Sequence, residues 1–284
     1  MRDFRDDCSR LGLADQPAPL ISVIVPHFND VQRLARCVQA LNAQSVQRDS
    51  FEIIVADNGS PCGIEAVGRA ALGARVISVR EKGAGPARNG ALGLARGCLL
   101  AFTDSDCVPD QNWLAEGRTA LETSDIVGGH VGVTVADPRS PTPVEAFEMI
   151  FAFDNKRYVE RLGFSVTANL FARRAVYDSI GGFKVGIPED LDWCRRARQA
   201  GFRLSYAHRA FVNHPARHDM QELISKWHRL TAESFGDVRM NGGNIGIWIA
   251  KSAAVFASPL RDATRVMTTR RVKGVAPRLS ATAV

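Results

Sequence analysis

The sequence lacks any pair of cysteines spaced as CxxC, and it has no long uninterrupted run of apolar residues. Its six cysteines are scattered over 284 residues, which argues against zinc ribbons and thioredoxin-type redox sites. Scattered cysteines in a chain of this length predict reduced thiols in the cytosol. No stretch reaches the roughly 18 apolar residues of a membrane-spanning helix. The charged start, MRDFRDDCSR, lacks the apolar segment of a signal peptide. We therefore expect a cytoplasmic protein.

The chain has little surplus charge outside its C-terminal end. Its formal net charge is +6. The segment from Asn244 to Val284 contains seven Lys and Arg residues but one acid, Asp262, so it holds the whole surplus and the first 243 residues are balanced. A balanced body argues against a nucleic-acid partner, whereas a basic end suits peripheral contact with an anionic membrane.

Short apolar runs alternate with helical patterns through the first half of the chain. Runs rich in β-branched residues predict four strands, at Ile21–Phe28, Phe51–Ser60, Ala74–Arg80 and Cys98–Asp104. Between the first two strands, apolar residues recur at helical spacing and predict a helix with one buried face, made of Leu34, Cys37, Val38 and Leu41. This alternation is typical of an α/β fold with a mostly parallel central sheet covered on both faces. Ligands of such sheets bind at the carboxyl ends of the strands, where Asp57 and Asp104 lie.

Two acids, two positions apart, follow the fourth predicted strand. In AFTDSDCVPDQNWL, Asp104 and Asp106 flank Ser105 directly after a buried apolar run. Paired carboxylates suit a hard divalent cation that takes oxygen ligands. Such a cation would bridge nucleotide phosphates and offset the charge on a departing diphosphate. The alternative is a surface turn in which an Asp caps the next helix.

Five motifs occur in order along the chain: SVIVPHFND, EIIVADNGS, GPARNGALGLARG, AFTDSDCVPDQNWL and PEDLDWCRRARQAGFRL. Together they resemble the inverting family 2 glycosyltransferases, whose fold is GT-A, a Rossmann-like central sheet flanked by helices. The resemblance covers Ile21 to His214. We divide the chain accordingly into an N-terminal extension (residues 1–19), a glycosyltransferase domain (residues 20–240) and a basic, partly amphipathic tail (residues 241–284).

The resemblance implies a site for a nucleotide-diphosphate sugar, with a UDP-sugar as the expected donor. It assigns Asp57 to the nucleoside, and Asn58 departs from the second acid that many members carry next to it. The other matching donor-site residues are Pro26, Phe28, Arg88, Asn89, Asp104, Ser105 and Asn169. Each main assignment has a structural alternative. Asp57 suits a strand-end turn, Arg88 and Asn89 suit scaffolding at a helix start, and Asn169 suits an ordinary strand-end polar residue.

The same resemblance places the catalytic carboxylates in the last motif. Asp190 matches the general base and Glu189 its neighbour, although acids at a helix start are also common partners of the helix dipole. A sugar hydroxyl is a poor nucleophile, so a carboxylate is needed to take its proton as the new bond forms. Asp104 and Asp106 match the residues that hold Mn²⁺ or Mg²⁺, and His214 matches a third metal ligand found in some members.

The segment after the last motif predicts two further helices. Gln221–Phe235 is amphipathic and lacks the QxxRW signature of processive synthases, so we expect one sugar per encounter. Ile245–Phe256 is apolar but interrupted by Lys251, which suits an interfacial helix at the inner face of the cytoplasmic membrane. The alternative is a helix packed on the body. The expected acceptor is a glycan or a lipid-linked saccharide in surface polysaccharide synthesis.

Two other functions stay open. A sugar nucleotidyltransferase shares the α/β layout, but its signature loop is expected after the first strand, where this chain has VPHFND. A non-catalytic GT-A scaffold protein is expected to lack Asp106 or Asp190, and this chain has both.

Overall fold

The computed structural model describes residues 19–240, 242, 244–256 and 269. The chain divides into two compact units. The first takes the residues up to Gly132, Asn155–Val185 and Glu189–Asn213, and the second takes Val133–Asp154, Gly186–Pro188 and the chain from His214 onwards. Nearly all of the predicted N-terminal extension, and every basic residue of the predicted tail after Lys251, lie outside the described residues.

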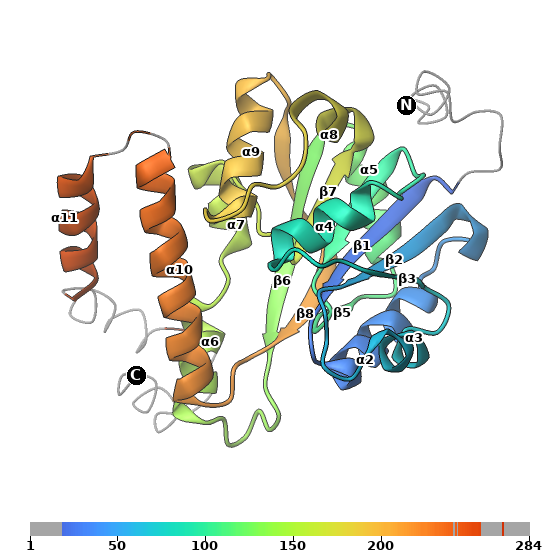
Figure 1. Ribbon diagram of the computed structural model, residues 1–284, viewed down its shortest axis with the longest axis horizontal. Coiled ribbons are helices and arrows are strands. Elements are labelled where there is room, and N and C mark those ends of the chain that lie inside the picture. Colours follow the sequence, from blue (N-terminus) through green and yellow to red (C-terminus); the bar gives the residue numbers. More distant parts are fainter. Residues whose placement is uncertain (1–18, 241, 243, 257–268, 270–284) are drawn as a thin grey trace. The chain divides into compact units, whose positions relative to one another are not determined.

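Eight strands form one sheet in the order β3-β2-β1-β4-β7-β6-β8-β5 (Figure 1). They are β1 (Ile21–His27), β2 (Phe51–Asp57), β3 (Arg75–Ser78), β4 (Leu99–Thr103), β5 (Val108–Pro109), β6 (Ile126–Thr134), β7 (Asn169–Arg173) and β8 (Leu204–Pro215). β1 pairs in parallel with β2 and β4, and β2 pairs in parallel with β3. β7 is antiparallel to both β4 and β6, and β5 is antiparallel to β8. The four predicted strands and the α/β fold class are confirmed.

Helices follow most strands of the first unit, and the helix between β1 and β2 is the one predicted from its apolar spacing. They are α2 (Val31–Asn42), α3 (Ile64–Ala70), α4 (Ala84–Leu92), α5 (Trp113–Leu121), α7 (Asn155–Arg157), α8 (Arg174–Ile180) and α9 (Glu189–Gln199), with a 3-10 turn η1 (Arg48–Ser50) and a π-helical turn η2 (Tyr158–Leu162). The Asp30 side chain caps α2 by accepting a hydrogen bond of 3.0 Å from the Arg33 amide. The predicted buried face of α2 is the observed one.

Successive residues of a strand point to opposite faces of the sheet. Because the strands carry apolar residues on both faces, helices pack on both. On one face, Leu170 and Ala172 of β7 join a core with α4, α8 and α9. On the other face, Phe171 packs against Trp113 of α5, with ring centroids 4.7 Å apart. This close approach requires Gly117, because a Cβ at that position would lie 2.3 Å from the Phe171 ring.

The parallel register brings the ends of three strands to one edge of the sheet. His27 of β1 pairs with Asp57 of β2, and Asp57 pairs with Ser78 of β3. β4 runs beside β1 in the same direction and leads into Asp104. The acids that the sequence places after two separate strands therefore share one edge, as predicted from the alternation of strands and helices.

The second unit contains α6 (Pro143–Phe151), α10 (Met220–Met240) and α11 (Ile245–Phe256). Thr142 and Glu145 form a capping box at the start of α6. Glu148, also on α6, is buried and accepts hydrogen bonds from Arg217 at 2.8 Å and from Lys226 at 2.9 Å. Burial lowers the pKa of the Lys226 amine although Glu148 opposes that effect. This ion pair fixes α10 to α6.

Cysteine chemistry departs from the prediction at one position. Cys37, Cys62, Cys107 and Cys194 are free thiols, whereas Cys98 is disulfide-bonded. The expectation of reduced thiols throughout is therefore wrong for Cys98. Cys8 lies outside the described residues.

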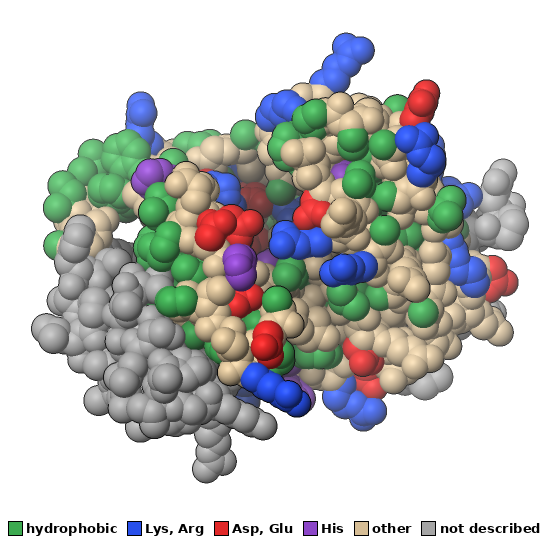
Figure 2. Space-filling view, turned by 90° about the horizontal axis from the view of Figure 1, so that it is seen from below, with side chains coloured by type: hydrophobic (Ala, Val, Ile, Leu, Met, Phe, Trp, Pro, Cys, Tyr) green, Lys and Arg blue, Asp and Glu red, His purple; other side chains and the backbone are tan. Residues whose placement is uncertain are grey.

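The surface and the helices agree with the charge and hydropathy patterns. Figure 2 shows one face of the molecule, on which Lys and Arg side chains alternate with Asp and Glu instead of forming one basic field. Within the described residues, no helix combines the length and the apolar character that crossing a membrane requires.

Candidate active site

The loops after β1 and β2 are joined by backbone and side-chain hydrogen bonds. The Asn58 amide donates to the His27 carbonyl at 2.8 Å, and the Asn29 amide donates to Ser60 Oγ at 2.8 Å. Asn29 has a φ of 53°, a left-handed conformation that Asn tolerates better than most residues. These bonds hold the ends of the two strands together.

Asp57 is buried and organises the turn that follows it. Its carboxylate accepts hydrogen bonds from the amides of Gly59 and Ser60, at 3.2 and 3.1 Å, and from the Ser60 hydroxyl. The structural alternative for Asp57, a strand-end turn residue, is thus observed. Contact with a nucleoside stays a prediction.

Asn58 has a role that the sequence did not indicate. Its Nδ2 donates to the carbonyls of Val79 at 3.0 Å and Glu81 at 2.6 Å, and its Oδ1 accepts from the Gly83 amide at 2.8 Å. An Asp has no N–H group and could not donate to the two carbonyls. The Asn that departs from the family pattern therefore shapes the loop between β3 and α4.

Pro26, His27 and Phe28 close the first strand in three different environments. Pro26 is buried within β1, whereas the Phe28 side chain is 56% exposed. His27 is buried, and within the described part of the chain neither of its ring nitrogens has a hydrogen-bond partner. Burial lowers the pKa of His27 below 6.5 although Asp57 and Asp30 oppose that effect. The imidazole is therefore neutral near pH 7.

Arg88 connects the loop after β4 to the amino end of α9. It is 3% exposed, and its guanidinium donates to Asp104 at 2.8 Å and to Glu189 at 2.9 Å. Burial alone would lower the pKa of Arg88, but the charges of Asp104 and Glu189 raise it above its ordinary value. The structure thus brings together three predicted site residues, with the cation already paired to both acids.

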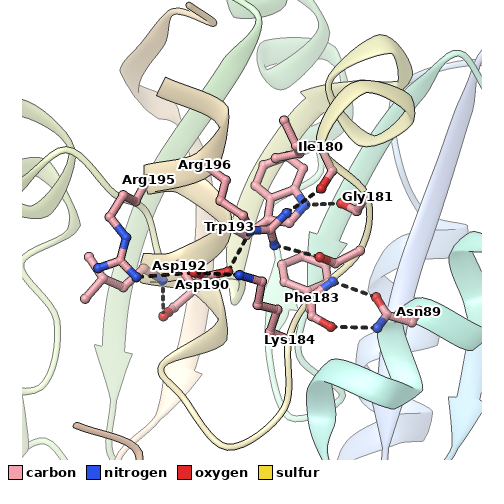
Figure 3. Close-up of polar contacts among 12 residues, drawn as sticks. Asn89, Ile180, Gly181, Phe183, Lys184, Asp190, Asp192, Trp193, Arg195 and Arg196 are labelled. Carbon is pink, nitrogen blue, oxygen red and sulfur yellow. Dashed lines mark hydrogen bonds and ion pairs between the residues drawn. The ribbon is translucent and has the colours of Figure 1, made fainter. Parts of the chain in front are cut away.

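Asn89 positions the segment that precedes α9. Its Nδ2 donates to the Phe183 carbonyl and its Oδ1 accepts from the Phe183 amide, both at 2.8 Å (Figure 3). Trp193 Nε1 donates to the Gly181 carbonyl at 3.1 Å. Arg196 donates to the Gly182 carbonyl at 2.7 Å. Hydrogen bonds from both α4 and α9 therefore hold residues 181–183 in place, which supports the scaffolding alternative for Asn89.

Asp190 follows Glu189 at the start of α9 and is half-buried. Its Oδ1 accepts a hydrogen bond of 2.7 Å from the Leu191 amide. Burial, and next the negative charge of Glu189, raise the pKa of Asp190 from 3.8 to about 7. A carboxylate with a pKa near the working pH is well matched to the task of a general base. Strongly perturbed pKa values are also typical of functional sites.

The loop after β4 carries Asp104, Ser105 and Asp106, all partly exposed. The Cys107 amide donates to the Asp104 carbonyl at 3.0 Å, which closes a tight turn. The Asp104 carboxylate faces Arg88 in this turn. Carboxylate oxygens of this kind are suitable ligands for Mn²⁺ and Mg²⁺. The Asp104 carboxylate, however, already forms an ion pair with Arg88.

His214 belongs to the second unit and lies next to Asn213 at the end of β8. It is 7% exposed, and its ring packs on Phe153 with centroids 4.8 Å apart. Its Nδ1 lies 2.7 Å from the Pro215 carbonyl oxygen. Because a carbonyl only accepts, Nδ1 carries the proton, and Nε2 then holds the lone pair that a metal would use.

Asn169 is the first residue of β7, and its side chain lies in the core. It is fully buried, and its Oδ1 accepts from Trp113 Nε1 at 2.9 Å. Its Nδ2 donates to the carbonyls of His130 and Ala210 at 2.8 and 2.9 Å. All three partners are structural, so the structure favours the alternative that Asn169 ties α5, β6 and β8 together. The predicted contact with sugar has no support here.

Comparisons with known proteins agree on one family. The model of glycosyl transferase family 2 matches residues 22–181. Glycosyltransferase AglE of Haloferax volcanii is 30% identical over 240 residues, which cover 81% of this chain and 75% of that protein.

Solved structures of glycosyltransferases resemble the fold. A mannosyltransferase from Pyrobaculum calidifontis, PcManGT, solved with GDP-Man and Mn²⁺, has a TM-score of 0.60 at 18% identity and covers 97% of this chain and 86% of that chain. Residues 1–349 of Staphylococcus aureus TarS, solved with UDP-GlcNAc, have a TM-score of 0.51 at 19% identity, with coverage of 77% and 66%. This chain spans 36% of a longer TarS chain. At these identities the likeness shows the fold, which is GT-A.

Proposed function

This chain belongs to glycosyl transferase family 2, and from that membership we propose that it moves one sugar from a nucleotide-diphosphate sugar, a UDP-sugar first, to a glycan or lipid-linked acceptor in surface polysaccharide synthesis. One observation carries the proposal. The buried Arg88 joins Asp104, after β4, to Glu189, directly before Asp190. The group that would face the donor and the group that would activate the acceptor are thus parts of one charge network.

Asp190 is the proposed general base. The acceptor hydroxyl gives its proton to the Asp190 carboxylate while its oxygen forms a bond to the anomeric carbon. The bond from that carbon to the diphosphate breaks in the same step, so the configuration is inverted. The raised pKa of Asp190 supports this role, since the carboxylate is then a strong enough base to accept the proton near neutral pH. Glu189 holds Arg88 and does not need to move a proton.

Arg88 is proposed to act on the donor indirectly. Its Nη1 donates to Glu189 and its Nη2 donates to Asp104, so it holds the Asp104 side chain in position. Asp104 and Ser105 would then contact the ribose, and Asp57 and Phe28 the base. Rigid support of this kind is what positions a ligand for reaction.

Asp106 and His214 are the residues that we propose to hold a divalent ion, Mn²⁺ or Mg²⁺. Carboxylate oxygen and imidazole nitrogen are suitable ligands for such an ion, and PcManGT was solved with Mn²⁺. When bound, the ion would offset the charge of the leaving diphosphate.

Contact with an anionic membrane is proposed for the second unit. Ile245, Ile247 and Ile249 of α11 are 52%, 56% and 57% exposed. Trp248 is not among the exposed residues, because it packs on Phe235 of α10 at 5.2 Å and donates to Ser234 at 3.2 Å. The exposed isoleucines and the basic residues that follow in the sequence are the two features of an interfacial anchor.

A donor screen tests the function directly. Purified protein is mixed with UDP-, GDP- and dTDP-sugars, with and without Mn²⁺ or Mg²⁺, and released nucleotide diphosphate is measured. We expect slow hydrolysis of one donor class that stops in excess EDTA. Full activity in EDTA would contradict metal dependence. Formation of a nucleotide sugar from a nucleoside triphosphate and a sugar phosphate would identify a nucleotidyltransferase instead.

A further inference from the structure

Lys82 lies over the exposed aromatic ring at the end of β1. Its Nζ is 5.2 Å from the centroid of the Phe28 ring, within the range of a cation–π contact. Both side chains are exposed. The sequence motifs assign Lys82 no role, because it stands before the glycine-rich segment and outside the family pattern.

The position of the Lys82 ammonium is fixed by its neighbours. Nζ donates to the Asn58 carbonyl at 2.8 Å. The side chain of the same Asn58 bonds to Val79, Glu81 and Gly83, so one residue holds both the loop that carries Lys82 and its terminal charge. A long side chain that is anchored at both ends loses less freedom on binding a ligand than an unanchored one.

The glycine beneath Lys82 leaves room for the ammonium. Gly59 has a φ of +80°, and a Cβ at that position would lie 2.9 Å from Lys82 Nζ. Gly59 follows Asp57 and Asn58 in the turn after β2. The ammonium therefore lies between the ends of β1 and β2, beside the acid proposed to contact the nucleoside.

We propose that Lys82 reads a carbonyl oxygen of the donor's nucleobase while the base stacks on Phe28. This inference rests on the proposed function and deepens it. Bases stack readily on exposed aromatic side chains. An ammonium has three donors and no acceptor, so it favours the carbonyl oxygens of uracil, thymine or guanine. Adenine has no carbonyl: its amino group is a donor, and its acceptors are ring nitrogens at other positions, so we expect donors with an adenine base to bind less tightly.

The Lys82→Met variant tests this reading. Methionine keeps most of the length and apolar surface of lysine and removes the charge. We expect wild-type protein to bind UDP at least about 10-fold more tightly than ADP. The variant should weaken the binding of both UDP and uridine by about 10- to 100-fold, the usual loss for a hydrogen bond from a charged group. The affinity for ADP and the thermal midpoint should not change.

Calorimetry measures the diphosphates, and ligand-observed NMR measures uridine. Lys156→Met is the matched control, because Lys156 is 64% exposed and its nearest acid, Glu160, is 4.0 Å away. The control should bind every ligand as wild type does. Asn58→Asp should reproduce the loss for uridine, and adding it to Lys82→Met should cause little further loss, because both changes act on one ammonium.

Three results would overturn the inference. Wild-type affinity of Lys82→Met for UDP would show that Lys82 does not touch the donor. A loss for UDP with unchanged binding of uridine would show that Lys82 holds a phosphate. In both cases the proposed transferase activity would stand. Failure of the wild-type protein to bind any nucleotide diphosphate, with or without Mn²⁺, would overturn both proposals together.

Discussion

Replacing Asp190 with Asn should slow the transfer and stabilise the protein at once. Burial, and next the charge of Glu189, raise the pKa of Asp190 from 3.8 to about 7. In the unfolded chain an Asp titrates near 3.9. Between about pH 4 and 7 the folded state therefore binds more protons than the unfolded state, and the free energy of unfolding falls as the pH rises. This penalty is absent below pH 4 and complete above pH 7.

The size of the effect follows from the same values. The difference between 3.8 and about 7, at about 1.4 kcal/mol per pKa unit, sets a ceiling of about 4 kcal/mol. Asp190 is half-buried, so solvent screening reduces the expected gain to about 1–3 kcal/mol. Asp190→Asn carries no charge at any pH and should show this gain at pH 8 and little or none at pH 4. Chemical denaturation at both values, without added metal, measures it.

The rate of transfer should fall in Asp190→Asn although the free energy of unfolding rises. Asp190→Asn should lower the rate of transfer by about 10²–10⁴, the usual cost of losing a general base, with donor affinity little changed. The wild-type rate should rise with pH to a plateau, with a midpoint near 7. Asp49→Asn, at an exposed acid, is the control and should alter neither property. An equal change in stability at pH 4 and pH 8, or lost donor affinity with turnover retained, would refute the assignment.

Three other changes test the remaining parts of the site and the proposed anchor. Asp106→Ala should abolish metal-dependent transfer and change the free energy of unfolding by less than about 1 kcal/mol; transfer retained with Mn²⁺ present would exclude Asp106 as a ligand. Arg88→Met should lower the free energy of unfolding, measured in urea, by about 3 kcal/mol, because it leaves two carboxylates without their buried cation; an unchanged midpoint would mean that the ion pairs add nothing. Replacing Ile245, Ile247 and Ile249 with Ser should abolish co-sedimentation with anionic liposomes, which salt should also reverse in wild type; unchanged sedimentation would exclude α11 as the anchor.

The sheet and the position of the acids were predictable because they depend on patterns close together in sequence. β-branched apolar runs predicted β1, β2, β3 and β4, and helical spacing predicted the buried face of α2. Parallel strands end at one edge, so Asp57 and Asp104 were expected at the same edge of the sheet. Neither pattern depends on which side chains meet across the fold.

The roles of two asparagines could not be predicted, because they depend on contacts between segments that are distant in sequence. Asn58 bonds to three backbone groups of a loop more than 20 residues away in sequence. Asn169 uses its amide on α5, β6 and β8. Each amide offers the same donors and acceptor, and only the folded chain determines which partners they reach. The same limit applies to Trp248, where the sequence indicated an apolar helix but not that the indole faces α10.

The order of the two acids at the start of α9 has a physical explanation. Arg88 is a single buried cation near three carboxylates, and it bonds to Asp104 at 2.8 Å and to Glu189 at 2.9 Å. A direct ion pair with Asp190 would favour its charged form, lower its pKa and make it a weaker base. Because Glu189 takes the second bond, Asp190 feels the positive charge of Arg88 only at a distance and the negative charge of Glu189 beside it. Exchanging the two residues would give the shorter side chain to the ion pair and remove the pKa that suits proton transfer near pH 7.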